Sequence, residues 1–226
     1  MRGLYLFIIW HNAAKKEAAI MQNINKRFEV FRTYEVNWSD KLFRVNLSRF
    51  YGKKLPKSCR KEKEVGFGAF KVVLVYDNKQ RLTCGKNKKM INAKARYRKL
   101  CGGNVIHASD NEAETNENLL FLFGKNIEEI KSERKRTKPL AYKHDLVGAQ
   151  GWKSQAEVID FARKISGVEV CESKQDYQFS ALDPFLLSRL LNAKKSKWPC
   201  SAKYFIMVNG KELPIYIHKS KPQKTK

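Results

Sequence analysis

The first forty residues alternate between strand-like and helix-like patterns of apolar side chains. Residues 4–10 are apolar without interruption, which is typical of a strand covered on both faces. Residues 13–28 repeat apolar side chains at the helical period, and residues 28–36 return to a β-branched and aromatic pattern. This order of strand, helix and strand predicts a βαβ unit, and hence an α/β fold with a mostly parallel sheet.

The middle of the chain continues the alternation. Residues 71–76 form an apolar strand pattern, and residues 90–100 read as a helix that Gly102 and Gly103 end. A short strand follows at residues 105–107. Ser109 and Glu112 then match a capping box, in which Ser109 bonds a backbone N–H and Glu112 reaches back, and the helix closes at Gly124.

The last third predicts a small α+β domain. Residues 126–142 are strongly charged and form the best candidate for a domain boundary, so we assign residues 1–140 to an anion- or nucleotide-binding domain. Residues 141–218 hold a second capping box at Ser154 and Glu157 and a β-hairpin around Asn209-Gly210. Residues 219–226 read as a basic tail.

Charge is the main compositional feature. The 226 residues include 46 basic and 22 acidic side chains, for a net charge of +24. This excess suggests a polyanionic partner such as a nucleotide, a phosphorylated glycan or a nucleic acid. A genome rich in Lys and Asn codons would produce the same excess without any function, and both interpretations stay open here.

The five cysteines and the hydropathy indicate where the chain resides. The cysteines are odd in number and widely spaced, and they form no CxxC pair, which argues against disulfides and a structural zinc site. They are Cys59, Cys84, Cys101, Cys171 and Cys200. The apolar run at residues 4–10 is too short to cross a bilayer. We therefore expect a cytoplasmic protein with no membrane span.

Two stretches near the first strand are candidates for a ligand edge. In parallel sheets ligands bind beyond the carboxyl ends of the strands, where His11 and Asn12 fall. The alternative is that both residues cap the following helix. Gly66 and Gly68 precede the strand at residues 71–76 and would let the backbone approach a ligand, although a simple turn explains them equally well.

The histidine and three cations that are candidates for catalysis and anion binding lie within residues 86–124. The predicted helix carries Lys94, Arg96 and Arg98, and the following strand carries His107. Arginine and lysine suit phosphate oxygens, and imidazole titrates near neutrality. A solvated helix face and a structural histidine are the competing interpretations.

Several segments together resemble a family of little-characterised proteins of surface polysaccharide or glycan assembly. In these proteins an N-terminal α/β domain is often followed by a nucleotidyltransferase-like domain. The resemblance covers most of residues 1–155, and the order and spacing of its segments carry it: 9–13, 46–52, 66–70, 94–98, 106–109, 145–149 and 151–152.

The chain departs from the family pattern at several positions. Asn104 stands where the resemblance implies a histidine, and Glu117-Asn118 stands where it implies a His-Asp pair. A nucleotidyltransferase-like site needs closely spaced carboxylates to hold Mg²⁺, but the corresponding region offers Asp183 alone. We therefore predict no metal site and no metal catalysis by residues 155–226, and a divergent, partly degenerate second domain.

Three functions are compatible with the sequence. The first is a transferase-like protein of glycan assembly, for glycosyl or nucleotidyl transfer, which binds a sugar nucleotide or phosphorylated acceptor; no cofactor is identified. The second is a nucleic-acid-binding protein without catalysis, and the third is a catalytically dead scaffold. For the first function His107 is the acid/base candidate, and the anion would be bound or bordered by Lys94, Arg96, Arg98, Arg49, Gly66 and Gly68.

Overall fold

The computed structural model describes residues 2–134, 138–172, 177–195 and 203–220. The chain divides into two compact units. The first consists of residues 1–119 and 127–145, and the second of residues 120–126 and 146–226. The sequence-based boundary at 140/141 therefore lies five residues before the structural one at 145/146, and the end of one helix belongs to the second unit. Of the predicted basic tail, residues 221–226 lie outside the described residues.

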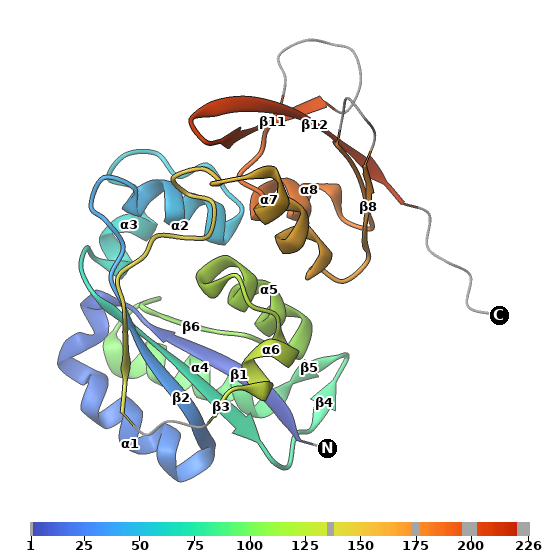
Figure 1. Cartoon of the computed structure of the whole chain (residues 1–226). Helices are drawn as coiled ribbons and strands as arrows, with labels where there is room; N and C mark the ends of the chain where they lie inside the picture. Colours follow the sequence, from blue (N-terminus) through green and yellow to red (C-terminus); the bar gives the residue numbers. More distant parts are fainter. Residues whose placement is uncertain (1, 135–137, 173–176, 196–202, 221–226) are drawn as a thin grey trace. The chain divides into compact units, whose positions relative to one another are not determined.

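The first unit is built on one sheet with the strand order β6-β1-β3-β2-β7 (Figure 1). Strand β3 lies between β1 and β2 and runs antiparallel to both, and β6 runs antiparallel to β1. Only the β2–β7 pair is parallel among the described pairings of this sheet. The strands are β1 (Gly3–Ile9), β2 (Glu29–Val36), β3 (Phe70–Asp77), β6 (Ile106–Ala108) and β7 (Leu140–Tyr142).

The predicted α/β composition is present, but the mostly parallel sheet is not confirmed. The βαβ unit does form, because β1 and β2 point the same way with helix α1 (Glu17–Arg27) between them. However, β3 inserts between the two strands as an antiparallel neighbour. With helix α4 (Lys88–Cys101) and β6, the order becomes the βαββαβ, ferredoxin-like arrangement.

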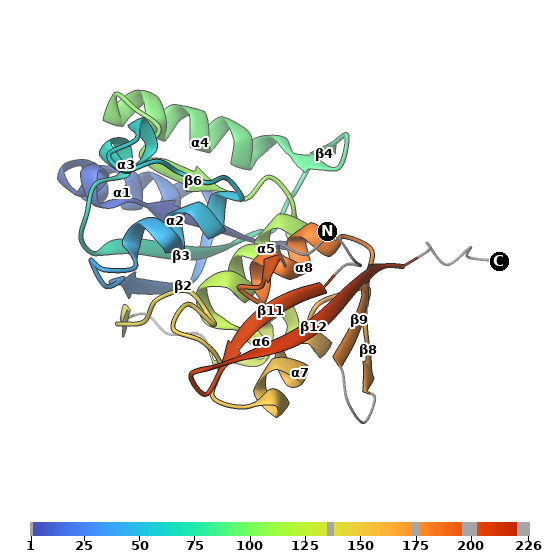
Figure 2. The same ribbon diagram turned by 90° about the horizontal axis from the view of Figure 1, so that it is seen from above.

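Two layers of helix cover the sheet. Tyr5, Phe7 and Ile9 of β1 pack with α1 and α4 in one apolar cluster, and Figure 2 shows both helices on the same side of the sheet. The opposite side carries α5 (Glu112–Phe123) and α6 (Ile127–Ser132) (Figure 2). Every residue of β1 is buried, as the continuous apolar run predicted.

The remaining elements of the first unit are short. Between the strands lie the 3-10 helix η1 (His11–Lys16), α2 (Phe43–Tyr51), α3 (Arg60–Val65) and the small strands β4 (Leu82–Thr83) and β5 (Lys86–Asn87). Gly102 ends α4 with φ +70°, the left-handed conformation that the predicted helix stop requires.

One predicted helix cap is wrong. Ser109 is fully buried and its Oγ accepts from Leu6 N at 3.1 Å instead of starting α5. The start of the helix is capped by Asn111, whose Oδ1 accepts from Glu114 N at 2.8 Å, while Glu114 Oε2 accepts from Asp110 N at 2.6 Å. The capping pair is thus shifted by two residues, because tertiary contacts with β1 occupy Ser109.

The second unit has its own sheet, with the order β10-β11-β12-β9-β8. The predicted hairpin is confirmed, since β11 and β12 pair antiparallel around Asn209 and Gly210, which both have positive φ. The predicted second capping box is also present: Ser154 Oγ accepts from Glu157 N, and Glu157 accepts from Lys153 N. The elements are α7 (Gln155–Arg163), β8 (Val168–Glu172), β9 (Tyr177–Ala181), α8 (Pro184–Leu190), β10 (Lys194–Lys195), β11 (Lys203–Val208) and β12 (Lys211–Lys219).

Candidate functional site

A row of three cations lies along the outer edge of β6. Lys61 Nζ donates to the carbonyl of Asn104 at 2.9 Å, and Arg98 Nε donates to that of Ile106 at 2.9 Å. Lys94 Nζ donates to the carbonyl of Ala108 at 3.1 Å. Strand β1 occupies the other edge of β6. The carbonyls of Asn104, Ile106 and Ala108 thus point away from β1. Cationic side chains satisfy them, and this also protects the strand edge from pairing with another strand.

His107 lies in the middle of this row. Its Nε2 is 3.0 Å from Asn118 Nδ2 of α5, and its ring meets the edge of the Phe50 ring with 5.4 Å between centroids. With the Asn118 amide as donor, neutral His107 accepts at Nε2 and carries its proton on Nδ1. Only 12% of the side chain is exposed.

The environment keeps His107 neutral. Burial is the main reason that the pKa of His107 falls to about 3. The positive charges of Lys94, Arg98 and Lys61 lower the pKa further. The Glu114 carboxyl group lies 3.7 Å from Nε2, and burial raises its own pKa. His107 is therefore unprotonated at neutral pH.

Tyr51 and Lys61 complete the surroundings. Trp10 Nε1 donates to Tyr51 Oη at 3.2 Å, and burial raises the pKa of Tyr51 well above its usual value. Lys61 Nζ lies 4.8 Å from the centroid of the Tyr51 ring, within the range of a cation–π contact. Burial lowers the pKa of Lys61. The cluster therefore combines buried neutral groups with cations whose hydrogen-bonding capacity is only partly used.

The structure separates the three cations predicted on α4. Lys94 and Arg98 reach the edge of β6 beside His107, and Lys94 also pairs with Asp110. Arg96 is exposed and lines a different hollow, between α1 and α4. Arg49 is buried on α2. The predicted anion set is therefore brought together only in part.

The predicted ligand-edge residues His11 and Asn12 contact backbone carbonyls within the first unit. Asn12 Nδ2 donates to the carbonyls of Lys63 at 2.8 Å and Glu64 at 2.9 Å, and His11 Nδ1 lies 3.3 Å from the Ala69 carbonyl. Neither side chain caps η1, so the alternative role as helix caps is wrong. Asn12 instead binds carbonyls of the last turn of α3, and His11 contacts the loop that follows this helix.

The two glycines make room for these side chains. Gly68 has φ +123°, and a Cβ at this position would lie 2.6 Å from His11 Nδ1. Gly66 has φ +73°, and a Cβ there would collide with the Asn12 amide. The close approach predicted at these glycines is therefore an approach to His11 and Asn12 within the same unit.

The sequence missed Lys61, Asn118 and Glu114. Lys61 lies in a run of basic residues, and nothing in the local pattern indicates that it reaches the edge of β6. Asn118 and Glu114 lie on α5 and meet His107 only through packing of α5 against the sheet. Only the tertiary fold brings these three residues to the site, so the local sequence gives no indication of their role.

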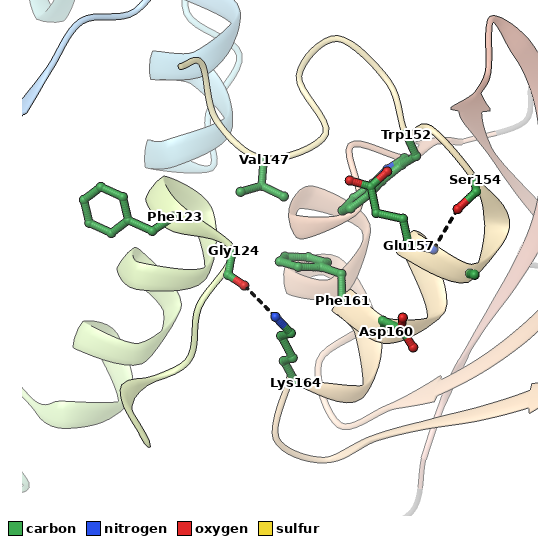
Figure 3. A pocket seen from close by; sticks show the side chains of 10 residues that line it. Phe123, Gly124, Val147, Trp152, Ser154, Glu157, Asp160, Phe161 and Lys164 are labelled. Atoms are coloured by element: carbon green, nitrogen blue, oxygen red, sulfur yellow. Dashed lines mark hydrogen bonds between the residues drawn. The ribbon is translucent and has the colours of Figure 1, made fainter. Parts of the chain in front are cut away.

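A separate hollow of about 530 Å³ lies in the second unit. Figure 3 shows Phe123, Trp152 and Phe161 around it, together with Ser154, Glu157 and Lys164. These polar groups have structural partners: Lys164 Nζ donates to the Gly124 carbonyl at 3.2 Å, and Ser154 and Glu157 form the cap of α7. The arrangement indicates no particular ligand.

Asp183 has a structural role at the start of α8. Its Oδ1 accepts from Leu186 N at 2.9 Å, and Pro184 occupies the first turn. Among the described residues, no group of three or more His, Cys, Asp or Glu side chains could hold a metal ion. In the same residues no helix is long and apolar enough to cross a membrane.

No protein-family model and no curated protein matches the chain. The resemblance to glycan-assembly proteins therefore stays a prediction.

Proposed function

We propose that the first unit binds the phosphate group of a nucleotide, sugar nucleotide or phosphorylated glycan along the outer edge of β6. The row formed by Lys61, Lys94 and Arg98 around a neutral His107 carries this proposal. The resemblance of residues 1–155 adds the context, a transferase-like protein of glycan or polysaccharide assembly. A fold of this type serves many functions, so the proposal rests on the site.

The three cations retain donors for a ligand. Arg98 uses its Nε on Ile106, which leaves the terminal nitrogens of the guanidinium for a forked contact with a phosphate. Each lysine has three N–H donors, and Lys61 spends one on Asn104. Because the cations are already held by backbone carbonyls, little side-chain freedom is lost when an anion binds. The row is thus organised before the ligand arrives.

His107 would act as a base in group transfer. A histidine with a pKa of about 3 is unprotonated at neutral pH, so in the free protein it can supply no proton from Nε2 and is only a weak base. A bound phosphate would offset the three positive charges and raise this pKa toward the working range. Ligand binding would then strengthen the base in the presence of the acceptor hydroxyl.

Calorimetric titration of the full chain with inorganic pyrophosphate, UDP and UDP-glucose tests the binding. Arg98→Gln and Lys61→Gln should each weaken binding about 10-fold or more, since a charge-assisted hydrogen bond contributes about 1.5–3 kcal/mol. Arg96→Gln is the matched control and should bind as tightly as the wild type. Equal affinity in all four proteins, or an equal loss in all three variants, would overturn the proposal.

The base role needs a separate experiment. His107→Asn should retain binding of pyrophosphate but lose turnover of a donor that the binding screen identifies. Folding of the variant is checked by circular dichroism. Full turnover in a folded His107→Asn protein would refute the role of His107 while leaving the binding proposal intact.

A further inference from the structure

The layer of helices η1, α1 and α4 on one side of the first sheet is strongly basic. Helices η1, α1 and α4 contain ten lysines and arginines and a single carboxylate, Glu17, which pairs with Lys71. The helices on the opposite side, α5 and α6, contain five glutamates and a single lysine. Charge is therefore sorted between the two layers shown in Figure 2.

This sorting argues against compositional bias as the explanation. A lysine-rich genome would place lysines on all solvent-accessible helices alike. Helices α5 and α6 have exposed and half-buried positions, yet glutamates occupy most of their charged positions. The excess of positive charge on the α1–α4 layer is thus a property of that surface.

The exposed cations of helices η1, α1 and α4 are here called the basic face. On α4, Lys88, Arg96 and Lys99 follow the helical period on the side away from the buried Met90, Ala93 and Tyr97. Lys15, Lys16 and Lys26 extend the surface over η1 and α1. None of these six side chains forms an ion pair within the described part of the chain, and all are exposed: Lys15, Lys16, Lys26, Lys88, Arg96 and Lys99.

A hollow of about 390 Å³ lies within the basic face. It is lined by Ala19 and Asn23 of α1 and by Arg96, Tyr97, Lys99 and Leu100 of α4. The hydroxyl of Tyr97 donates to Asn23 Oδ1 at 3.0 Å, which joins the two helices. Two cations that line a concave surface suit an anionic strand that lies across both helices.

We propose that the basic face docks the phosphate backbone of a double-stranded nucleic acid. The choice of a polyanion rests on charge complementarity. The six exposed cations have no protein partners within the described part of the chain, and a duplex presents a closely spaced row of phosphates that could pair with them. The surface is distinct from the β6 edge and does not depend on the function proposed there.

Two observations distinguish this partner from other polyanions. An anionic membrane would require exposed apolar anchors, but within η1, α1 and α4 only Leu100 is a large apolar side chain with substantial exposure, 45%. A single strand would require exposed large rings for base stacking, and the one Phe, Tyr or Trp side chain of these three helices, Tyr97, is 1% exposed. The surface therefore offers contacts to phosphates and few to bases, which predicts binding without sequence specificity.

Fluorescence anisotropy with a labelled 20-bp DNA duplex and an RNA duplex of the same sequence tests the proposal, using the full chain in 0.05–0.3 M salt. If most of the six cations contact phosphates, the logarithm of affinity should fall with the logarithm of salt concentration with a slope of about −4 to −5. The variant Lys26→Glu/Arg96→Glu/Lys99→Glu should lose about 100-fold in affinity at 0.1 M salt. A milder Lys26→Gln/Arg96→Gln/Lys99→Gln variant covers the case in which the first fails to fold.

The matched control is Lys53→Glu/Lys54→Glu/Lys57→Glu, which makes the same change of net charge at exposed lysines between α2 and α3, outside the basic face. It should lose less than about 5-fold, because only long-range attraction is reduced. An equal loss in the control and the test variants would overturn the proposal, since net charge alone would then explain binding. Tighter binding to phosphatidylserine vesicles or to single strands of the same sequences would overturn it as well.

Discussion

The first unit carries two sets of cations that differ in what holds them. Lys61, Lys94 and Arg98 are partly buried and donate to alternate carbonyls at the edge of β6. The cations of the basic face, such as Arg96 and Lys99, are exposed and extend into solvent. The two sets meet on α4, where Arg96 and Arg98 are only two residues apart but point to different surroundings.

Under the two proposals, this difference would give two kinds of anion recognition. Cations fixed in place and partly desolvated give directional hydrogen bonds that salt screens weakly. Exposed cations give long-range attraction that falls steeply as the salt concentration rises. The following substitutions should separate the two behaviours.

Asn87→Ala should affect both sets, because Asn87 anchors the start of α4. Its Oδ1 accepts from Lys89 N and Met90 N, and its Nδ2 donates to the fully buried Asp77 carboxylate at 3.0 Å. Loss of the cap together with a donor to a buried charge should cost about 2–4 kcal/mol of unfolding free energy. Native-state hydrogen exchange of β1 amides measures this for the first unit alone.

Asn92→Ala on the exposed side of α4 is the control and should change stability by less than about 0.5 kcal/mol. A small effect of Asn87→Ala would mean that α4 is held in place by its packing alone, and that the cap does not support the two cation sets.

The stability of the first unit should depend on His107 between pH 6.5 and 4.5. The pKa of His107 is about 3 when folded, below its unfolded value of 6.5, so the unfolded state takes up the proton first. Stability is then lost as pH falls, by on the order of 2–3 kcal/mol across this window. Glu114 acts in the opposite direction, because its pKa is raised on folding.

His107→Asn should remove most of this pH dependence, measured by exchange of the β1 and β6 amides at several pH values. His144→Asn, at an exposed position, should leave it unchanged. A wild-type profile that is flat from pH 6.5 to 4.5 would contradict the assigned environment of His107.

Arg98→Leu and Arg96→Leu compare the two sets directly. Arg98→Leu leaves the Ile106 carbonyl without its donor and should cost about 1–2 kcal/mol. Arg96→Leu removes a solvated charge and should stay within about 0.5 kcal/mol of the wild type. Urea titrations followed by exchange of β6 amides give both values, and equal costs would erase the distinction between the sets.

Asn118→Asp should raise the pKa of His107 by about one unit or more. A carboxylate would then replace an amide donor 3.0 Å from Nε2 and favour the imidazolium. The position is of interest because the family resemblance implies an aspartate there. Nitrogen-15 NMR of the ring follows the titration, and an unchanged pKa would show that Asn118 does not contact the ring in solution.

Local patterns predicted much of the secondary structure. The buried run of β1, the stop of α4 at Gly102 and the hairpin at Asn209-Gly210 all follow from neighbouring residues. The insertion of β3 between β1 and β2 does not, because strand pairing depends on packing between residues far apart in sequence. A βαβ pattern alone does not reveal that an antiparallel strand will separate its two strands.

The candidate site was predictable to a similar extent. His107, Lys94 and Arg98 lie within a short stretch, and their meeting across one strand edge follows from a helix returning to an adjacent strand. Lys61 and Asn118 come from elements whose position is set only by the tertiary fold. Gly66 and Gly68 were recognised as sites of close approach, but the sequence could not show that His11 and Asn12 fill the space.

The pKa of His107 with and without a bound anion tests the central claim most directly. Nitrogen-15 NMR of the imidazole, recorded from pH 8 to 4 in the free protein and with saturating pyrophosphate, gives both values. A ring that stays neutral to below pH 5 when free, and whose pKa rises on addition of pyrophosphate, would agree with three cations that share a phosphate at the β6 edge. A ring that titrates near 6.5 when free, or whose pKa does not respond to pyrophosphate, would contradict it.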